Sequence, residues 1–127
     1  MCGLRSLVKY VVLTKCKCHR ADSVQVLEII IYNQPSLVKN NFGLDYHPFH
    51  AHGGHYYDIG SGNGTYNATE NELKLQNYNP VLRDTTNLYR YTTKQTVDSD
   101  AGWRAWRLRV EDAGVWMVCT TTPQTAA

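Results

Sequence analysis

Three histidines lie within six residues of each other, at His47, His50 and His52. Neutral imidazole is a common metal ligand, so this density predicts metal binding. In an extended segment side chains alternate between faces at roughly 3.3 Å per residue, which places His50 and His52 on one face with Cα atoms about 6 to 7 Å apart. Pro48 restrains His47 to an extended conformation and turns it away from this pair. The spacing therefore predicts two separate metal positions.

Three sequence blocks around these histidines occur together in one family. The run His47-Pro-Phe-His50-Ala-His52-Gly resembles the HPxHxHG motif in the last cupredoxin domain of multicopper oxidases, the group that contains laccases and ascorbate oxidase. Asn79–Thr85 resembles the NPxxRDT segment of that family, and Gly102–Val110 with Asp112–Met117 resembles the two strands before its final copper motif. The order and approximate spacing agree from about Val24 to Val118. An isolated HxH pair is weak evidence, whereas these blocks in sequence are specific.

The resemblance implies a role for each histidine. His47 would bind the type 1 copper, which receives electrons from the substrate, while His50 would bind the type 2 copper and His52 a type 3 copper of the oxygen-reducing cluster. Copper is then the cofactor, and the partners are O2, a small reducing substrate such as a diphenol or ascorbate, and the preceding cupredoxin domains. The long connection Tyr89–Ala101 is closer to the ascorbate-oxidase-like, fungal type. His55 lies one position later than a histidine common in the family, and we interpret it as a second-shell or structural residue.

The match to the family ends at its last ligands. The family continues with His-Cys-His, a further histidine and usually a methionine or leucine, whereas this chain reads Val118-Cys119-Thr120 with no later histidine or methionine. Cys119 is one position too early, and threonine cannot replace imidazole as a ligand. We therefore expect residues 119–127 to be an aberrant tail and the chain as given to be inactive. A frameshift, a misplaced splice junction or a truncated gene would produce this pattern.

Two other interpretations use the same residues differently. A non-enzymatic, cupredoxin-like fragment would bind copper weakly through His50 and His52, or not at all. A cupin enzyme would need a glutamate after the HxH pair and a distant histidine, but the first acidic residue after His52 is Asp58 and no distant histidine follows. Separately, Cys16-Lys17-Cys18-His19 offers three candidate soft-metal ligands but lacks the paired spacing of structural zinc, which favours a surface segment.

Composition limits the remaining possibilities. The 127 residues are 43% hydrophobic and 19% charged, which indicates one folded domain. A net charge of +2 gives no basic stripe for nucleic acid, and no run reaches the roughly 20 apolar residues of a membrane-spanning helix. We expect residues 1–22 to be an unmatched, poorly ordered leader without a convincing signal peptide, and residues 23–118 to be a partial plastocyanin-like domain. The family and the glycosylation acceptors Asn63 and Asn67 favour a secreted protein.

The elements that must position the histidines are predicted to be strands. β-Branched and alternating residues indicate strands at Val24–Tyr32, His55–Ile59, Val81–Thr85 and Trp103–Val110, with a turn of helix near 70–75. In the last strand we expect Trp106, Leu108 and Val110 on one face and arginines outside it. Trp103, Trp106 and Trp116 are predicted core aromatics, and Arg83 with Asp84 a possible ion pair. The fold class is all-β, a cupredoxin-like Greek-key sandwich or barrel that is incomplete.

Overall fold

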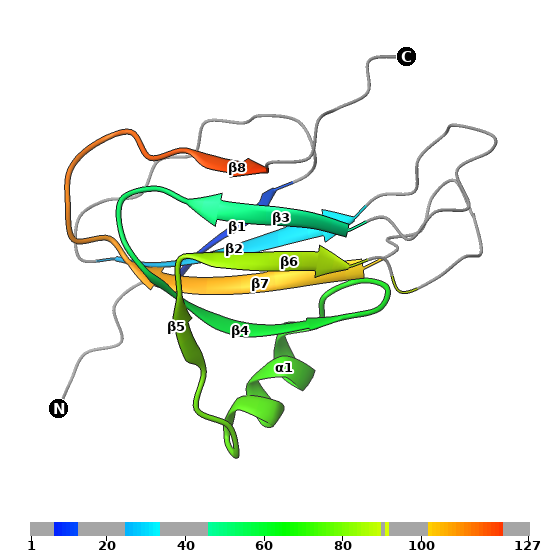
Figure 1. The fold of residues 1–127 in the computed structure, drawn as a ribbon. Coiled ribbons are helices and arrows are strands. Elements are labelled where there is room, and N and C mark those ends of the chain that lie inside the picture. Colours follow the sequence, from blue (N-terminus) through cyan, green and yellow to red (C-terminus); the bar gives the residue numbers. More distant parts are fainter. Residues whose placement is uncertain (1–6, 13–24, 34–45, 90, 92–101, 121–127) are drawn as a thin grey trace, which may run out of the picture.

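The computed structural model describes residues 7–12, 25–33, 46–89, 91 and 102–120. These residues form two β-sheets and one short helix (Figure 1). The first sheet has the strand order β1-β2-β7-β4-β5 and the second has the order β6-β3-β8. The strands are β1 Leu7–Val12, β2 Val26–Asn33, β3 Tyr46–Ala51, β4 Tyr56–Gly62, β5 Val81–Arg83, β6 Thr85–Tyr89, β7 Gly102–Arg109 and β8 Val118–Thr120, and the helix is α1 Ala68–Leu75.

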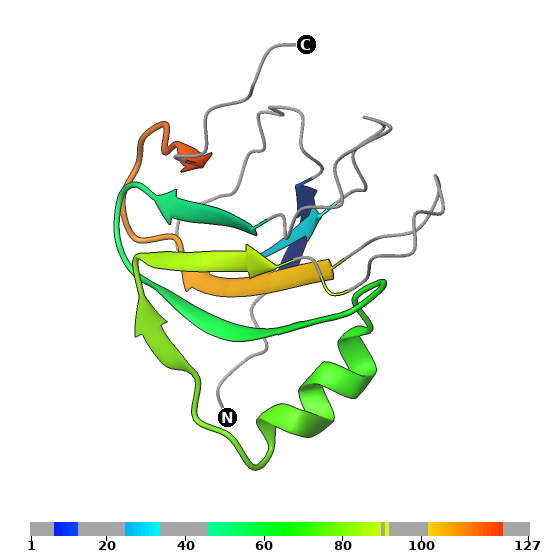
Figure 2. The same cartoon turned by 45° about the vertical axis from the view of Figure 1, so that its right-hand side comes forward.

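Strand β2 lies inside the larger sheet, between β1 and the central strand β7, and its run of isoleucines is buried on both faces. Ile29 and Ile31 pack with Trp106 between the two sheets. Ile30 packs with Trp103 on the opposite face of the sheet, and the partly buried Tyr66 and Leu75 pack against this second cluster. Figure 2 shows this arrangement, with the smaller sheet on one side of the larger sheet and α1 on the other. Both faces of the larger sheet are therefore covered, and β3 packs on the face that looks toward the smaller sheet.

The helix is attached to the sheet by its own polar residues. Asn67 caps the N-terminus, since its side-chain oxygen accepts hydrogen bonds from the backbone N–H groups of Thr69 and Glu70. Asn71 is buried and donates a hydrogen bond to the Ile59 carbonyl on β4, at 3.0 Å. These contacts fix the loop after β4, so the short helix is held by specific bonds more than by a strong apolar face.

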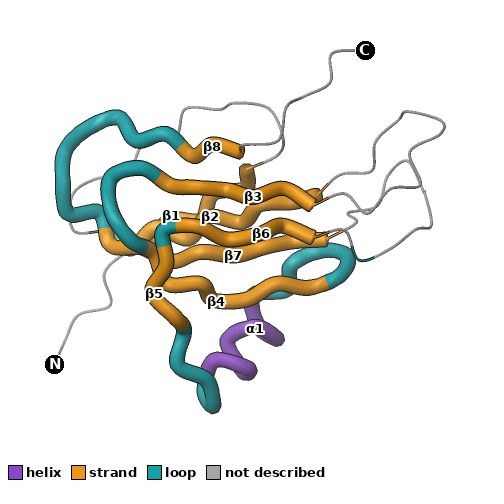
Figure 3. The backbone as a smooth tube through the Cα atoms, in the orientation of Figure 1, coloured by secondary structure: helices purple, strands orange, loops and turns teal. Residues whose placement is uncertain are grey.

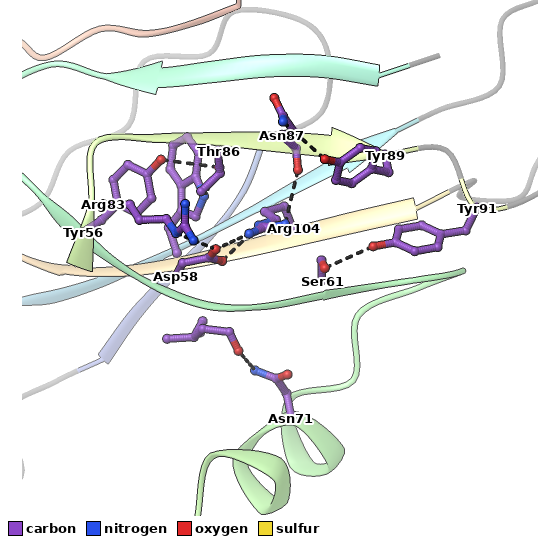
Figure 4. A network of polar contacts seen from close by, with 12 residues as sticks. Tyr56, Asp58, Ser61, Asn71, Arg83, Thr86, Asn87, Tyr89, Tyr91 and Arg104 are labelled. Atoms are coloured by element: carbon purple, nitrogen blue, oxygen red, sulfur yellow. Dashed lines mark hydrogen bonds and ion pairs between the residues drawn. The ribbon is translucent and has the colours of Figure 1, made fainter. Parts of the chain in front are cut away.

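Buried polar groups connect the two sheets (Figure 4). Thr86 on β6 accepts hydrogen bonds from the indole N–H of Trp106 at 2.9 Å and from the hydroxyl of Tyr56 at 3.4 Å. Arg104 on β7 binds Asp58 on β4 and donates to the Asn87 carbonyl on β6 at 3.3 Å. The expectation that the arginines of this strand lie outside the core is therefore wrong for Arg104, whose charge is neutralised by a buried carboxylate.

The predicted fold class is confirmed, since the described residues form a mainly antiparallel, all-β, cupredoxin-like sandwich whose barrel is not closed (Figure 3). Three of the predicted strands and the short helix are present with small shifts at their ends. The predicted strand Val81–Thr85 is wrong as a single element, because the chain passes from the larger sheet (β5) to the smaller one (β6) at Asp84. Leu7–Val12, within the predicted leader, forms β1 and pairs in parallel with β2. Trp116 is half exposed, so its assignment to the core is wrong. Within the described ranges, no helix is long and apolar enough to cross a membrane.

Candidate metal centre

Strand β3 carries the first two motif histidines on opposite faces. His47 shares its face of the strand with Phe49 and Ala51, which pack on the core between the sheets. His50 lies on the other face, and its Cα partners are Thr85 on β6 and Cys119 on β8. A continuous strand across Pro48 therefore separates His47 from His50, in agreement with the two directions that the spacing predicts.

The orientation of His50 is set by a backbone carbonyl. Its Nδ1 lies 2.9 Å from the carbonyl oxygen of Asp84. Because a carbonyl can only accept, Nδ1 carries the proton in this contact and Nε2 keeps the lone pair that a metal requires. The same carbonyl accepts a hydrogen bond from the Ala51 N–H at 3.2 Å, so it is itself fixed by β3. One ring nitrogen of His50 is thus hydrogen-bonded to a carbonyl, as is typical of a histidine that binds metal through the other.

Asp84 contributes to the site through its main-chain carbonyl, a role that no residue type signals. The predicted ion pair between Arg83 and Asp84 is replaced by a different contact, since Arg83 Nε lies 3.7 Å from Asp58 Oδ2. The Asp84 carboxylate instead accepts a hydrogen bond from the Thr85 hydroxyl at 3.2 Å. Backbone acceptors depend on strand register, and register is visible only once the strands are paired.

The third histidine is adjacent to His50 and to a thiol. The ring centroids of His50 and His52 are 5.1 Å apart with a tilt of 57° between the ring planes. His52 Nε2 lies 3.8 Å from Cys119 Sγ, and the His52 N–H donates to the Met117 carbonyl at 2.9 Å. The segment that precedes and begins β8 therefore runs directly beside the histidine pair.

A glycine allows this close approach. Gly53 has a φ of +81°, and a Cβ added to it would lie 2.3 Å from the ring of Trp116. The indole of Trp116 therefore lies on the bare backbone of the turn that follows His52. This contact explains both why Trp116 leaves the core and why the motif ends in glycine.

The remaining predicted site residues lie elsewhere. His55 is exposed beyond the glycine turn, and its second-shell role stays a prediction. Asn63 is exposed in the loop after β4, while Asn67 caps α1. Within the part of the chain that the structure describes, no group of three or more His, Cys, Asp or Glu side chains converges to hold a metal ion. The candidate centre is therefore the pair His50 and His52, with Cys119 beside it and His47 on the opposite face.

This donor set suits copper. Imidazole is a good ligand for copper, and the ordered Nδ1 contact of His50 leaves its outer nitrogen available for coordination. The cupredoxin-like sandwich, with His50 on β3 and His52 directly after it, has the fold of a copper-protein domain and holds part of a ligand set. The residues present thus fit copper in their chemistry. Two neighbouring imidazoles are fewer ligands than an enclosed copper site needs.

Comparison with known proteins gives the family. The family model described as multicopper oxidase matches residues 16–121. Multicopper oxidase terE of Aspergillus terreus is 57% identical over 105 residues, which are 79% of this chain and 19% of that protein. Laccase-like multicopper oxidase 1 of Thermothelomyces thermophilus is 46% identical over 106 residues, or 80% of this chain and 16% of the relative. An L-ascorbate oxidase of Cucumis sativus is 33% identical over 92 residues, or 72% and 14%.

The chain therefore belongs to the multicopper oxidase family, and copper is the cofactor that this membership implies. It spans less than a fifth of the length of these relatives.

Proposed function

We propose that this chain supplies one part of the copper-binding apparatus of a multicopper oxidase. In this role His47 binds the type 1 copper, His50 the type 2 copper and His52 a type 3 copper. Copper, when bound, supplies one-electron oxidation of a diphenol-like or ascorbate-like substrate and the reduction of O2 to water. The observation that supports the proposal is the oriented histidine pair, with ring centroids 5.1 Å apart and the Nδ1 of His50 held by the Asp84 carbonyl.

In this scheme the residues of this chain bind copper and orient the ligands that hold it. The Asp84 carbonyl selects the tautomer of His50 that presents Nε2 outward. The bond from the His52 N–H to the Met117 carbonyl fixes the backbone on which the second imidazole is placed. His47, on the opposite face of β3, is separated from this pair by the width of the strand. Electron entry and oxygen reduction would thus use different faces of one strand.

We infer that the 127 residues alone bind copper without oxidase activity. Cys119 lies between Val118 and Thr120, so no histidine flanks it in the sequence, and the chain has five histidines in total. The described part of the chain also holds no convergent group of three ligands. A blue type 1 site needs a cysteine thiolate with two histidines, whereas His47, the residue assigned to that copper, lies on the face of β3 opposite to Cys119. The non-enzymatic alternative is thus the one that we favour for the chain by itself.

A copper titration tests the proposal. The full 127-residue chain is titrated with Cu(II) and followed by electron paramagnetic resonance, by visible absorption and by oxygen consumption with a diphenol. We expect Cu(II) signals with nitrogen coupling, no intense blue band and no oxygen uptake. His50→Ala and His52→Ala should each weaken Cu(II) affinity by at least about tenfold. Loss of a residue that only orients a ligand already costs about 10- to 100-fold, and loss of the ligand itself should cost no less.

Tyr57→Ala is the control, because it removes a half-exposed aromatic ring that has no part in the proposed copper site. Unchanged Cu(II) affinity in both His50→Ala and His52→Ala would contradict the assignment of the pair. A blue, fully loaded chain that consumes oxygen would contradict the proposal that it is inactive alone.

We also propose that the protein is secreted and glycosylated. Asn63 is exposed in the loop after β4, where a glycan meets no packed side chain of the core. Asn67 Nδ2 donates to Glu70 Oε1 at 3.1 Å, so a glycan there competes with a bond of the helix cap. Expression through a secretory host should therefore give a glycosidase-sensitive mobility shift that Asn63→Gln reduces more than Asn67→Gln does. A shift that persists unchanged in Asn63→Gln would sink this assignment.

A further inference from the structure

A polar cavity lies between the two sheets at β6, an edge strand of the smaller sheet. Its volume is about 230 Å³, which is below the roughly 300 to 1,000 Å³ of pockets for drug-sized ligands. The lining residues come from β5, β6 and β7 and are Arg83, Thr85, Thr86, Asn87, Tyr89 and Arg104. The cavity therefore suits a small polar ligand, and it shares no residue with the histidine motif.

Two guanidinium groups of this cavity share one carboxylate. Arg104 on β7 donates from Nε to Asp58 Oδ1 at 2.9 Å and makes a second bond to Asp58 Oδ2 (Figure 4). Arg83 on β5 lies farther from the same carboxylate, with 3.7 Å between Nε and Oδ2, which is beyond a normal hydrogen bond. Because Asp58 is already paired with Arg104, this group of three side chains has one positive charge in excess.

The excess charge belongs to Arg83. Its side chain is half exposed, and among the residues that the structure describes its guanidinium group donates no hydrogen bond. The carboxylate of the next residue, Asp84, does not line the cavity and accepts a hydrogen bond from the Thr85 hydroxyl at 3.2 Å. Asp84 is exposed, so water and salt screen its charge. The fork of N–H donors on Arg83 is thus available to an acceptor that enters the cavity.

Arg104 and Tyr89 provide further donors. A guanidinium group has five N–H donors, and Arg104 uses three of them for Asp58 and for the Asn87 carbonyl, which leaves two. The hydroxyl of Tyr89 accepts a hydrogen bond from Asn87 Nδ2 at 3.3 Å, so its own proton remains available to a ligand. The cavity therefore presents N–H and O–H donors from both sheets next to an unneutralised cation.

We propose that this cavity binds a small carboxylate, with Arg83 as the main anchor and Arg104 and Tyr89 as further donors. The planar fork of arginine matches the two oxygens of a carboxylate. One carboxylate also brings the single negative charge that balances the excess. The group belongs either to a free organic acid or to an acidic side chain of another protein segment. This role lies outside the copper chemistry, because none of the histidines lines the cavity.

Nuclear magnetic resonance titration of the full chain tests the proposal. The probes are sodium acetate, which represents a free acid, and a blocked Gly-Glu-Gly peptide, which represents an acidic side chain, both at constant ionic strength in chloride. We expect saturable shifts of the backbone amides of Thr85, Asn87 and Tyr89 and of the Arg83 Nε–H. Tighter binding of acetate supports a free acid as the ligand, and tighter binding of the peptide supports a protein segment.

Variants identify the anchor. Arg83→Gln should weaken acetate binding by at least about tenfold, the loss expected for one hydrogen bond to a charged group. Arg83→Lys keeps the charge without the fork and should lie between Arg83→Gln and wild type. Tyr89→Phe removes one neutral donor and should weaken binding by a smaller factor. Arg109→Gln is the matched control, because it removes an exposed arginine of β7 that does not line the cavity.

Two results would overturn the inference. One is unchanged acetate affinity in Arg83→Gln. The other is that chloride alone, at the concentration of acetate, reproduces the shifts, which would show that the cavity responds to ionic strength and does not recognise a carboxylate. Neither result bears on the copper proposal, whose readout is the Cu(II) signal of the histidine pair.

Discussion

At the scale of single residues, the histidine motif is built by backbone contacts more than by side-chain contacts. The Asp84 carbonyl orients His50, the Met117 carbonyl binds the N–H of His52, and the bare backbone of Gly53 receives the ring of Trp116. Each of these contacts depends on which backbone atoms are brought together by strand pairing. The histidines themselves can be recognised in the sequence. The contacts that support them are made by backbone atoms, which every residue has, so no residue type predicts them.

The glycine of the motif gives the residue-scale prediction. Gly53→Ala forces a Cβ to within 2.3 Å of Trp116 at a φ of +81°. The backbone term costs on the order of 1 kcal/mol, and displacement of the indole adds about 1 to 3 kcal/mol. Urea unfolding should therefore show a lower free energy of unfolding, and Trp116 fluorescence should change in the folded state.

Gly64→Ala is the matched control, since Gly64 has a similar φ of +68° with no atom within 4 Å of the added Cβ. It should show the backbone term alone. Equal losses in the two variants would mean that the contact with Trp116 contributes nothing.

At the scale of elements, charged groups attach the loop and helix to the larger sheet. Glu28 on β2 is fully buried, and its carboxylate accepts hydrogen bonds from Tyr66 at 3.0 Å and from Arg107 at 2.6 Å. Arg107 also binds Glu72 on α1. Burial lowers the pKa of Arg107, but its bonds to Glu72 and Glu28 outweigh this effect and raise the pKa overall. A buried carboxylate is thus neutralised by one cation that also holds the helix.

Tyr66 gives the element-scale prediction, which is a pH dependence. Burial, followed by the charge of Glu28, raises the pKa of Tyr66 from 10.0 to about 12. The unfolded chain therefore releases this proton first, so the stability from neutral Tyr66 is complete below pH 10 and is lost as pH rises through about 12. Tyr66→Phe lacks this ionisation, and its free energy of unfolding should fall less steeply over that interval.

The measurement is urea unfolding at a series of pH values for wild type, Tyr66→Phe and the control Tyr57→Phe, which alters a half-exposed tyrosine. At neutral pH Tyr66→Phe should also lose about 1.5 kcal/mol or more, because its hydroxyl donates to a carboxylate. Parallel pH curves for Tyr66→Phe and wild type would refute the role of this ionisation.

The elements also show where sequence reasoning was sufficient. Alternation and β-branched residues predicted β2, β4 and β7, because their side-chain pattern is local to each strand. The position of Arg104 could not be predicted this way, since its burial depends on Asp58, 46 residues away. Residue type predicts a core position for Trp116, but its ring packs on the backbone of Gly53 and is half exposed. Long-range partners decided both cases, and a single sequence does not reveal them.

At the scale of the whole molecule, the two sheets must stay together for the metal centre to exist. His50 lies on β3 in the smaller sheet and His52 directly follows this strand, while most of the buried aromatic residues belong to the larger sheet. Trp106 and Tyr56 stack with centroids 4.0 Å apart, and both donate to Thr86 on β6. The burial that surrounds this group also raises the pKa of Tyr56. One threonine hydroxyl thus serves as the acceptor for two donors from the opposite sheet.

Thr86→Val tests this connection, because valine keeps the shape of threonine and removes the acceptor. The N–H of Trp106, whose side chain is fully buried, is then left without its partner, which costs about 1 to 3 kcal/mol. The free energy of unfolding should fall by this amount, and the indole N–H of Trp106 should exchange faster with solvent. Thr86→Ser keeps the acceptor and should retain slow exchange despite the loss of a methyl group. If Thr86→Val is as stable as wild type and exchanges as slowly, the hydroxyl of Thr86 does not contribute to holding the two sheets together.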